Sequence, residues 1–200
     1  MSEYILELQD IVKTFPGVVA LDHVKFQLKK GEIHALMGEN GAGKSTFIKV
    51  IMGVYEPDAG KVILNGKEVH FKSPLDAAAN SIAAIYQHST VYPHLTIAEN
   101  IFVGHYKKKR GFINWSSMYK ETKELLESLG SDLDPQTLMG NLTVAEQQIV
   151  EIAKAVSTKA QILIMDEPTA ALSKHECEQL YRISEKLNKE GTSIIFISHR

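Results

Sequence analysis

The fold of this chain is decided by the stretch Gly38-Glu39-Asn40-Gly41-Ala42-Gly43-Lys44-Ser45-Thr46. It fits the pattern G-x-x-x-x-G-K-[ST], and it lies between a predicted buried strand (32–37) and a predicted helix (47–52) that ends at Gly53. Its glycines allow backbone angles at which successive N–H groups converge on one anion, beside the partial positive charge of the helix N-terminus. Lys44 can then reach terminal phosphates, and the Ser45 hydroxyl can coordinate Mg²⁺. The alternative, a plain glycine-rich turn, does not explain Lys-Ser-Thr at this offset.

Composition limits the remaining possibilities. The 200 residues, 44% hydrophobic, suit one globular domain or one domain with a small insertion. The net charge of −2, from 22 basic and 24 acidic residues, gives no basic field, so no nucleic-acid partner is expected. The single cysteine, Cys177, excludes an internal disulfide and fits a reducing compartment. We expect no signal peptide, and no run approaches the roughly 18 apolar residues of a membrane span, so a membrane role needs a partner.

The first half of the chain predicts a small antiparallel sheet around the beginning of an α/β core. Residues 4–12 and 18–29 alternate apolar and polar residues, as half-buried strands do, with a turn at 14–17 between them. A further strand at 60–64 leads into Asn65-Gly66, a hairpin signal, and then into residues 68–71.

Residues from about 95 to 157 predict a helical subdomain inserted into this core. One helix is expected over 96–103, and another over 115–129, whose apolar stripe, including Trp115, is predicted to face the core. A third begins at Thr143, because Glu146 three residues later completes a capping box. The basic run 107–110 predicts a solvated turn, with a contact to acidic lipid or a partner as the alternative.

The core then resumes with an apolar strand (161–166) that ends in Asp166. Ligands gather at the carboxyl ends of parallel strands, so Asp166 can hold Mg²⁺ opposite Ser45. If the backbone stays extended, the next side chain, Glu167, points away from the metal and toward an attacking water, which favours hydrolysis over transfer to a second substrate. The following helix begins at Ser173, and Cys177 is predicted to lie on its buried face. A last strand covers 193–197.

In this order, the motifs resemble those of the ATP-binding subunits of ABC transporters, and the similarity covers the whole chain. The matching segments are GENGAGKST (38–46), Gln87 after a strand, LTVAEQQ (142–148), ILIMDEPTAAL (162–172) and ISH ending at His199. The resemblance implies an α/β fold with a P-loop NTPase core, an antiparallel β-subdomain and an inserted helical subdomain. It also implies ATP and Mg²⁺ as cofactors.

The same resemblance assigns roles to single residues. Phe15 would stack on adenine, beside the phosphate loop 38–46, and Ser45, Gln87 and Asp166 would surround Mg²⁺. Glu167 would be the catalytic carboxylate, Gln87 the switch glutamine that joins the metal to the membrane domain, and His199 the switch histidine at the γ-phosphate. The signature motif, which faces nucleotide on a second ATP-binding domain, would be Leu142, Thr143, Val144, Ala145 and Glu146.

The signature and the Gly-Phe-Ile-Asn-Trp segment (111–115) are closest to those of bacterial monosaccharide importers. The signature departs from the usual Leu-Ser-Gly-Gly-Gln, since Val144 and Ala145 add Cβ atoms and Glu146 adds negative charge. Ser173 stands where the family usually has Asp.

These features together predict Mg²⁺-dependent ATP hydrolysis that drives import of a sugar or similar small solute through a separate membrane permease. The chain would lie on the cytoplasmic face of the membrane as a peripheral domain, cut before its last strands, and would serve a solute-binding protein indirectly. Its second ATP-binding domain would come from the same longer chain or from a homodimer. Two alternatives remain. The first is a soluble ABC ATPase that acts on ribosomes or DNA, which the acidic charge balance and the signature disfavour. The second is a P-loop kinase, which Glu167 and the signature disfavour.

Overall fold

Two four-stranded sheets organise the computed structural model, which describes residues 3–39, 41–86, 91–109 and 111–199. The first sheet has the strand order β2-β1-β4-β5, and the second has the order β3-β10-β9-β6. Two predicted site residues, Asn40 and Gln87, lie outside the described residues.

The first sheet is antiparallel, as the alternating sequence predicts. It consists of β1 (Tyr4–Phe15), β2 (Val18–Lys29), β4 (Ala59–Leu64) and β5 (Lys67–Val69). Asn65 and Gly66 both have positive φ, 51° and 77°, between the paired residues Leu64 and Lys67. This is the two-residue turn whose backbone twist matches that of a hairpin, so the hairpin prediction is confirmed.

The second sheet is parallel and forms the α/β core from β3 (Ile33–Met37), β6 (Ile82–Ile85), β9 (Ile162–Asp166) and β10 (Ser193–Ser198). Along β9, Ile162 and Ile164 belong to the apolar cluster shared with the first sheet, whereas Leu163 and Met165 belong to the cluster shared with the helices. Both faces are therefore buried, which explains the uninterrupted apolar sequence of this strand.

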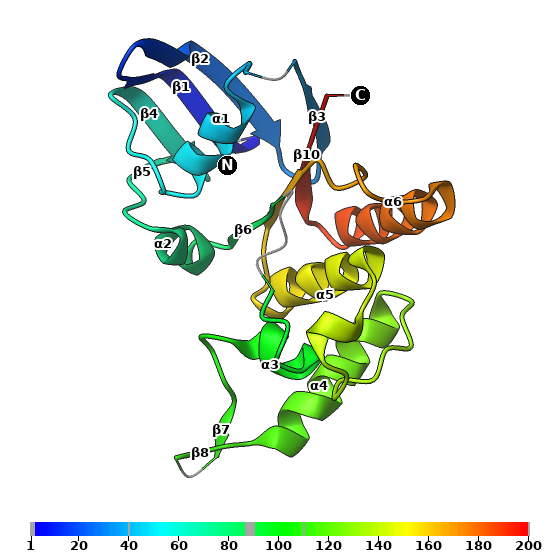
Figure 1. Cartoon of the computed structure of the whole chain (residues 1–200). Helices are drawn as coiled ribbons and strands as arrows, with labels where there is room; N and C mark the ends of the chain where they lie inside the picture. The colour runs from blue at the N-terminus through cyan, green and yellow to red at the C-terminus, as the bar shows by residue number, and fades with distance from the viewer. Residues whose placement is uncertain (1–2, 40, 87–90, 110, 200) are drawn as a thin grey trace.

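The helices are α1 (Lys44–Ile51), α2 (Pro74–Ala79), α3 (Ile97–Phe102), α4 (Trp115–Ser128), α5 (Val144–Ser157) and α6 (Lys174–Lys189), with a 3₁₀ turn, η1, at Met139–Asn141. Figure 1 shows α1 beside the antiparallel sheet, whereas α3, α4 and α5 gather on the opposite side of the molecule. None of the described helices is long and apolar enough to cross a bilayer.

Three details of the structure differ from the sequence-based expectations. The basic run is not only a turn, because β7 (Lys108–Lys109) pairs with β8 (Phe112–Ile113) in a short hairpin. Trp115 is 40% exposed, because α4 begins beside β8, far from the core sheet, and buries its face farther along, at Met118 and Leu126. Cys177 is only half-buried, since it lies in the first turn of α6, and the buried face of that helix begins at Leu180.

Candidate functional site

A cavity of about 370 Å³, a size typical of small-molecule sites, is lined by nine of the predicted site residues, whereas Gly38, Glu39 and His199 are not among its lining residues. It lies between the tip of the β1–β2 hairpin, the loop that precedes α1, and the end of β9. Its lining residues are Phe15, Val18, Val19, Ala20, Gly41, Ala42, Gly43, Lys44, Ser45, Thr46, Asp166 and Glu167.

The loop before α1 is built to expose backbone N–H groups. Gly43, the N-cap residue, has φ 82°, and a Cβ at this position would lie 2.3 Å from the Ala20 carbonyl oxygen, so only glycine fits. Gly43 supplies no side-chain cap, and the first turn of α1 carries no acidic residue. In contrast, the N-cap side chains of α2 to α6 all accept a hydrogen bond. Within the described residues, the first N–H groups of α1 therefore have no side-chain cap and are available to an anion in the cavity.

The Lys44 ammonium group spans this loop. Its Nζ donates to the carbonyl oxygens of Gly38, at 2.6 Å, and Glu39, at 2.9 Å. The same cavity is lined by Ser45, an exposed residue in the first turn of α1, directly after Lys44. One fixed positive charge and a hydroxyl thus lie beside the uncapped helix end, a combination suited to a polyphosphate.

Asp166 provides the carboxylate expected at the end of β9. Burial, together with the charge of Glu167, raises the pKa of Asp166, while Lys44 and Lys49 oppose this rise. A bound cation would counteract both the burial and the charge of Glu167, and would therefore favour the charged form of Asp166. Among the described residues, no cluster of three or more His, Cys, Asp and Glu side chains could hold a metal alone. The oxygen donors of Ser45 and Asp166 nevertheless fit Mg²⁺, which commonly takes one or two protein oxygens plus substrate phosphates and water.

Glu167 and His199 are joined directly, with 2.7 Å between Glu167 Oε1 and His199 Nδ1. The contact arises because β9 and β10 are parallel neighbours, so the residues that follow them lie at the same edge of the sheet. The expectation of an extended backbone is wrong at Glu167, whose φ is 50° and whose N–H donates to the Ile197 carbonyl at 2.9 Å. A non-glycine residue in this left-handed region is uncommon and tends to occur at functional sites.

Phe15 lies at the rim of the same cavity. It is the last residue of β1, pairs with Val18, and is half-buried. Its ring meets the edge of the Tyr55 ring, with centroids 5.2 Å apart and an angle of 68° between the planes. The structure therefore brings Phe15 together with the phosphate loop, as an adenine-stacking residue requires.

The signature segment is separate from this cavity, since none of the described lining residues comes from 142–146. Thr143 is the N-cap of α5, and the predicted capping box is present. Glu146 Oε2 accepts from the Thr143 backbone N–H at 2.8 Å and from its hydroxyl at 2.9 Å. The Glu146 carboxylate is thus turned onto its own helix end, while Val144 is 52% exposed beside it.

Two residues to which the sequence assigned no role connect these parts. The Gln148 side chain on α5 donates to the Pro168 carbonyl at 2.8 Å, which links the signature helix to the segment just after Glu167. Asp58 binds the end of β1 next to Phe15. Gln148 lies in the matched LTVAEQQ segment, but no local pattern predicts either contact, because the partners lie 20 and 44 positions away.

Comparison with known proteins identifies the family of the chain. The family model described as "ABC transporter" matches residues 21–170. A putative ribose/galactose/methyl galactoside import ATP-binding protein of Agrobacterium fabrum is 52% identical over 200 residues, which cover 100% of this chain and 39% of that protein. The xylose import ATP-binding protein of Thermoanaerobacter pseudethanolicus is 50% identical over 202 residues, covering 100% of this chain and 40% of that protein. This chain therefore spans about two fifths of the length of these relatives.

Solved structures agree with the fold. The ADP conformation of an ATP-binding cassette of an ABC transporter has a TM-score of 0.87 and 27% identity, covering 100% of this chain and 82% of that one. A dimeric bacterial ABC transporter cassette has a TM-score of 0.83 and 25% identity, covering 98% of this chain and 88% of that one. With the fold, the site geometry and the matched residues in agreement, the chain belongs to the ABC transporter family.

Proposed function

We propose that this chain binds ATP with Mg²⁺ and hydrolyses it. One observation carries the proposal: the Lys44 loop, Asp166 and Glu167 line one cavity, although they come from distant parts of the chain. The loop supplies N–H groups and an ammonium group for phosphate, and the acidic pair supplies a metal ligand and a base. An aromatic residue, Phe15, stands at the rim where a base would stack.

Each residue has a distinct part in the proposed reaction. Lys44 and the N-terminus of α1 hold the β- and γ-phosphates, while Ser45 and Asp166 hold Mg²⁺, which when bound neutralises phosphate charge. Glu167 accepts the proton of the attacking water. His199, bound to Glu167 at 2.7 Å, fixes the orientation of that carboxylate and lies ready to contact the γ-phosphate. Gln87, outside the described residues, is proposed to complete the metal site.

At the level of the whole protein, we propose that hydrolysis drives import of a monosaccharide through a separate membrane permease, with a solute-binding protein acting upstream. The relatives are named as import ATP-binding proteins for ribose, galactose or xylose, which supports this proposal over a ribosomal or DNA-directed ATPase. The chain would then act at the cytoplasmic face of the membrane.

We also propose that two ATP-binding domains enclose the nucleotide head to tail, and the dimeric state of a similar cassette supports a pairing of two domains. In this arrangement the Lys44 cavity meets the signature helix of a partner domain. The partner domain comes either from a longer chain, since this one covers only 39–40% of two relatives, or from a second copy.

The phosphate role of Lys44 is tested by Lys44→Ala. Removing the only cationic side chain that lines the described cavity should cost on the order of 2–4 kcal/mol, or about 30- to 1,000-fold in MgATP affinity by calorimetry. The control is Lys61→Ala, which removes a surface lysine paired with Glu68 on the neighbouring sheet. If Lys44→Ala binds MgATP within threefold of the parent, the proposed site is wrong.

A further inference from the structure

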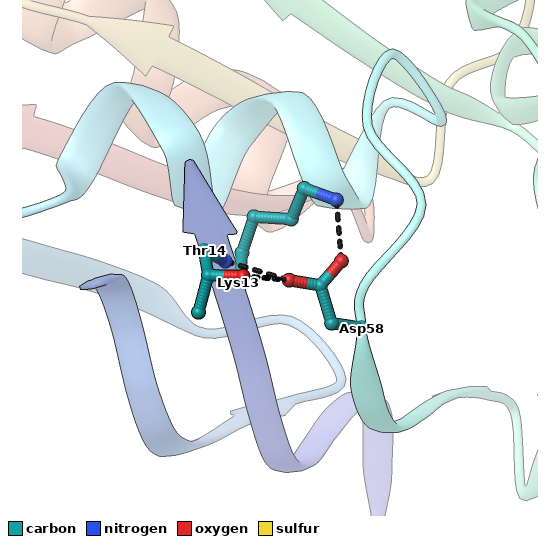
Figure 2. A network of polar contacts seen from close by, with 3 residues as sticks. All are labelled: Lys13, Thr14 and Asp58. Carbon is teal, nitrogen blue, oxygen red and sulfur yellow. Dashed lines mark hydrogen bonds and ion pairs between the residues drawn. The ribbon is translucent and has the colours of Figure 1, made fainter. Parts of the chain in front are cut away.

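The end of β1 is fastened to the loop that follows α1 by one carboxylate. Asp58 Oδ1 pairs with Lys13 Nζ at 2.7 Å, and Asp58 Oδ2 accepts from both the backbone N–H and the hydroxyl of Thr14, each at 2.7 Å (Figure 2). These three bonds lower the pKa of Asp58 to about 2, so the carboxylate is charged at any physiological pH. The residue next to this junction is Phe15.

The same loop carries an aromatic ring against Phe15. Tyr55 meets the Phe15 ring edge-on at 5.2 Å, a favourable geometry for two aromatic side chains. Tyr55 is itself fixed to α1, because its N–H donates to the Lys49 carbonyl at 3.1 Å and the Lys49 ammonium group lies 5.3 Å from its ring centroid. Tyr55 lines a groove with Val50, Val62 and Phe71, not the cavity of Phe15 and Lys44. Tyr55 therefore contacts Phe15 without lining that cavity.

We propose that Asp58 and Tyr55 are positioning residues for the nucleobase, acting through Phe15 without touching the nucleotide. The proposal rests on the nucleotide site proposed above. Asp58 fixes the backbone just before Phe15, and Tyr55 limits the tilt of its ring. Because Tyr55 is attached to α1, whose first turn holds the phosphates, the pair also sets the distance between base and phosphate subsites. The recognised group is the planar base of a nucleoside triphosphate.

The test compares two probes by calorimetry on the full chain: MgATP, and magnesium tripolyphosphate, which has no base. Phe15→Leu should weaken MgATP binding by about 5- to 150-fold, the worth of one stacked base, and leave tripolyphosphate binding unchanged. Asp58→Ala and Tyr55→Leu should each weaken MgATP binding by about 3- to 10-fold, again without changing tripolyphosphate binding. Tyr55→Phe, which keeps the aromatic ring, should bind MgATP as tightly as the parent does.

A matched control and a double variant separate positioning from general damage. Glu68→Ala removes another exposed carboxylate of the same sheet, paired with Lys61 and His70, and should leave both affinities unchanged. If Asp58 acts through Phe15, adding Asp58→Ala to Phe15→Leu should cause no further loss.

Three results would overturn the positioning role. The first is an MgATP affinity of Asp58→Ala and Tyr55→Leu equal to that of the parent, and the second is an equally large loss of tripolyphosphate binding. The third is a double variant in which Asp58→Ala weakens MgATP binding as much as it does alone. An unchanged MgATP affinity in Phe15→Leu would overturn base stacking, and the positioning role with it, while leaving the phosphate site in place. A parent that binds neither probe would instead refute the proposed function itself.

Discussion

Replacing Glu167 by glutamine tests the proposed chemistry most directly. The amide is nearly isosteric with the carboxylate, and its oxygen can still accept a hydrogen bond from the His199 ring, now 2.7 Å from Glu167 Oε1. The substitution therefore removes the negative charge and the basicity while keeping the shape of the site.

The substitution has two possible effects, a weaker contact with His199 and the loss of the general base, and the structure distinguishes them. His199 is 35% exposed, so water can replace a weakened contact, and the structural loss should be small. The Glu167 side chain is only 12% exposed and faces the cavity, so water can supply no equivalent base. A positioned general base contributes about 10²- to 10⁴-fold, which is about 2.7–5.4 kcal/mol of the barrier. Nearly all of this should appear in the chemical step.

The assay is single-turnover hydrolysis of MgATP by the assembled transporter, alongside MgATP affinity by calorimetry. We expect affinity within about twofold of the parent and a hydrolysis rate lower by 10²- to 10⁴-fold. The matched control is Glu190→Gln, which changes an exposed carboxylate at the end of α6. Hydrolysis by Glu167→Gln at half the parent rate would show that another group activates the water.

Two further predictions concern stability and self-sufficiency. The folded pKa of Asp58, about 2, lies below its ordinary value of 3.8, so Asp58 stabilises the fold above pH 3.8, and this contribution is lost as the pH falls through about 2. Asp58→Asn should therefore unfold more readily than the parent at neutral pH and lose less stability on acidification, as measured by chemical denaturation at several pH values; parallel curves would contradict this. The 200-residue chain alone should bind MgATP but hydrolyse it slowly, because in the proposed head-to-tail arrangement a partner domain closes the Lys44 site; fast turnover that is independent of protein concentration would contradict that arrangement.

Local sequence signals predicted the parts of this molecule whose chemistry is local. The phosphate loop needs glycines, lysine and a helix start within nine positions, and the caps at Thr143 and Ser173 need a glutamate three residues later. All of these features are present in the structure. Buried parallel strands are equally visible, because both faces of β9 must be apolar.

Features set by distant partners could not be predicted from local patterns. The left-handed backbone of Glu167 is accompanied by the hydrogen bond of its N–H to Ile197 on β10, 30 positions away in the sequence. The Asp58 junction joins residues separated by 44 positions, and nothing near Asp58 distinguishes it from an ordinary turn residue. Trp115 continues a helical apolar stripe, yet the stripe extends beyond the surface that α4 packs against. The periodicity of a sequence predicts which face of a helix is apolar. How much of that face is buried depends on the elements that pack against the helix.

The last prediction follows from a difference between two helix N-termini that the head-to-tail arrangement would place at nucleotide. The first turn of α1 has no side-chain cap and no acid, so its N–H groups are available to phosphate. The first turn of α5 is already capped, since Thr143 Oγ1 accepts from Glu146 N–H at 3.3 Å and Glu146 Oε2 occupies the Thr143 N–H. A phosphate that approaches α5 would meet a carboxylate and the exposed Val144 side chain where the usual motif has neutral glutamine and glycine.

The two sites of the assembled ATPase should therefore be unequal, with the Lys44 site the faster one. Ala145→Asp, which adds a second negative charge at the α5 end, should reduce steady-state ATP hydrolysis by the reconstituted transporter much less than Glu167→Gln does. Glu146→Gln serves as the matched control, because it keeps the capping oxygen, removes the charge, and should leave turnover equal or higher. Electrostatic repulsion at an essential site would cost about as much as loss of the general base. If Ala145→Asp is as damaging as Glu167→Gln, the signature of this chain serves an indispensable site, and the self-capped end of α5 does not weaken it.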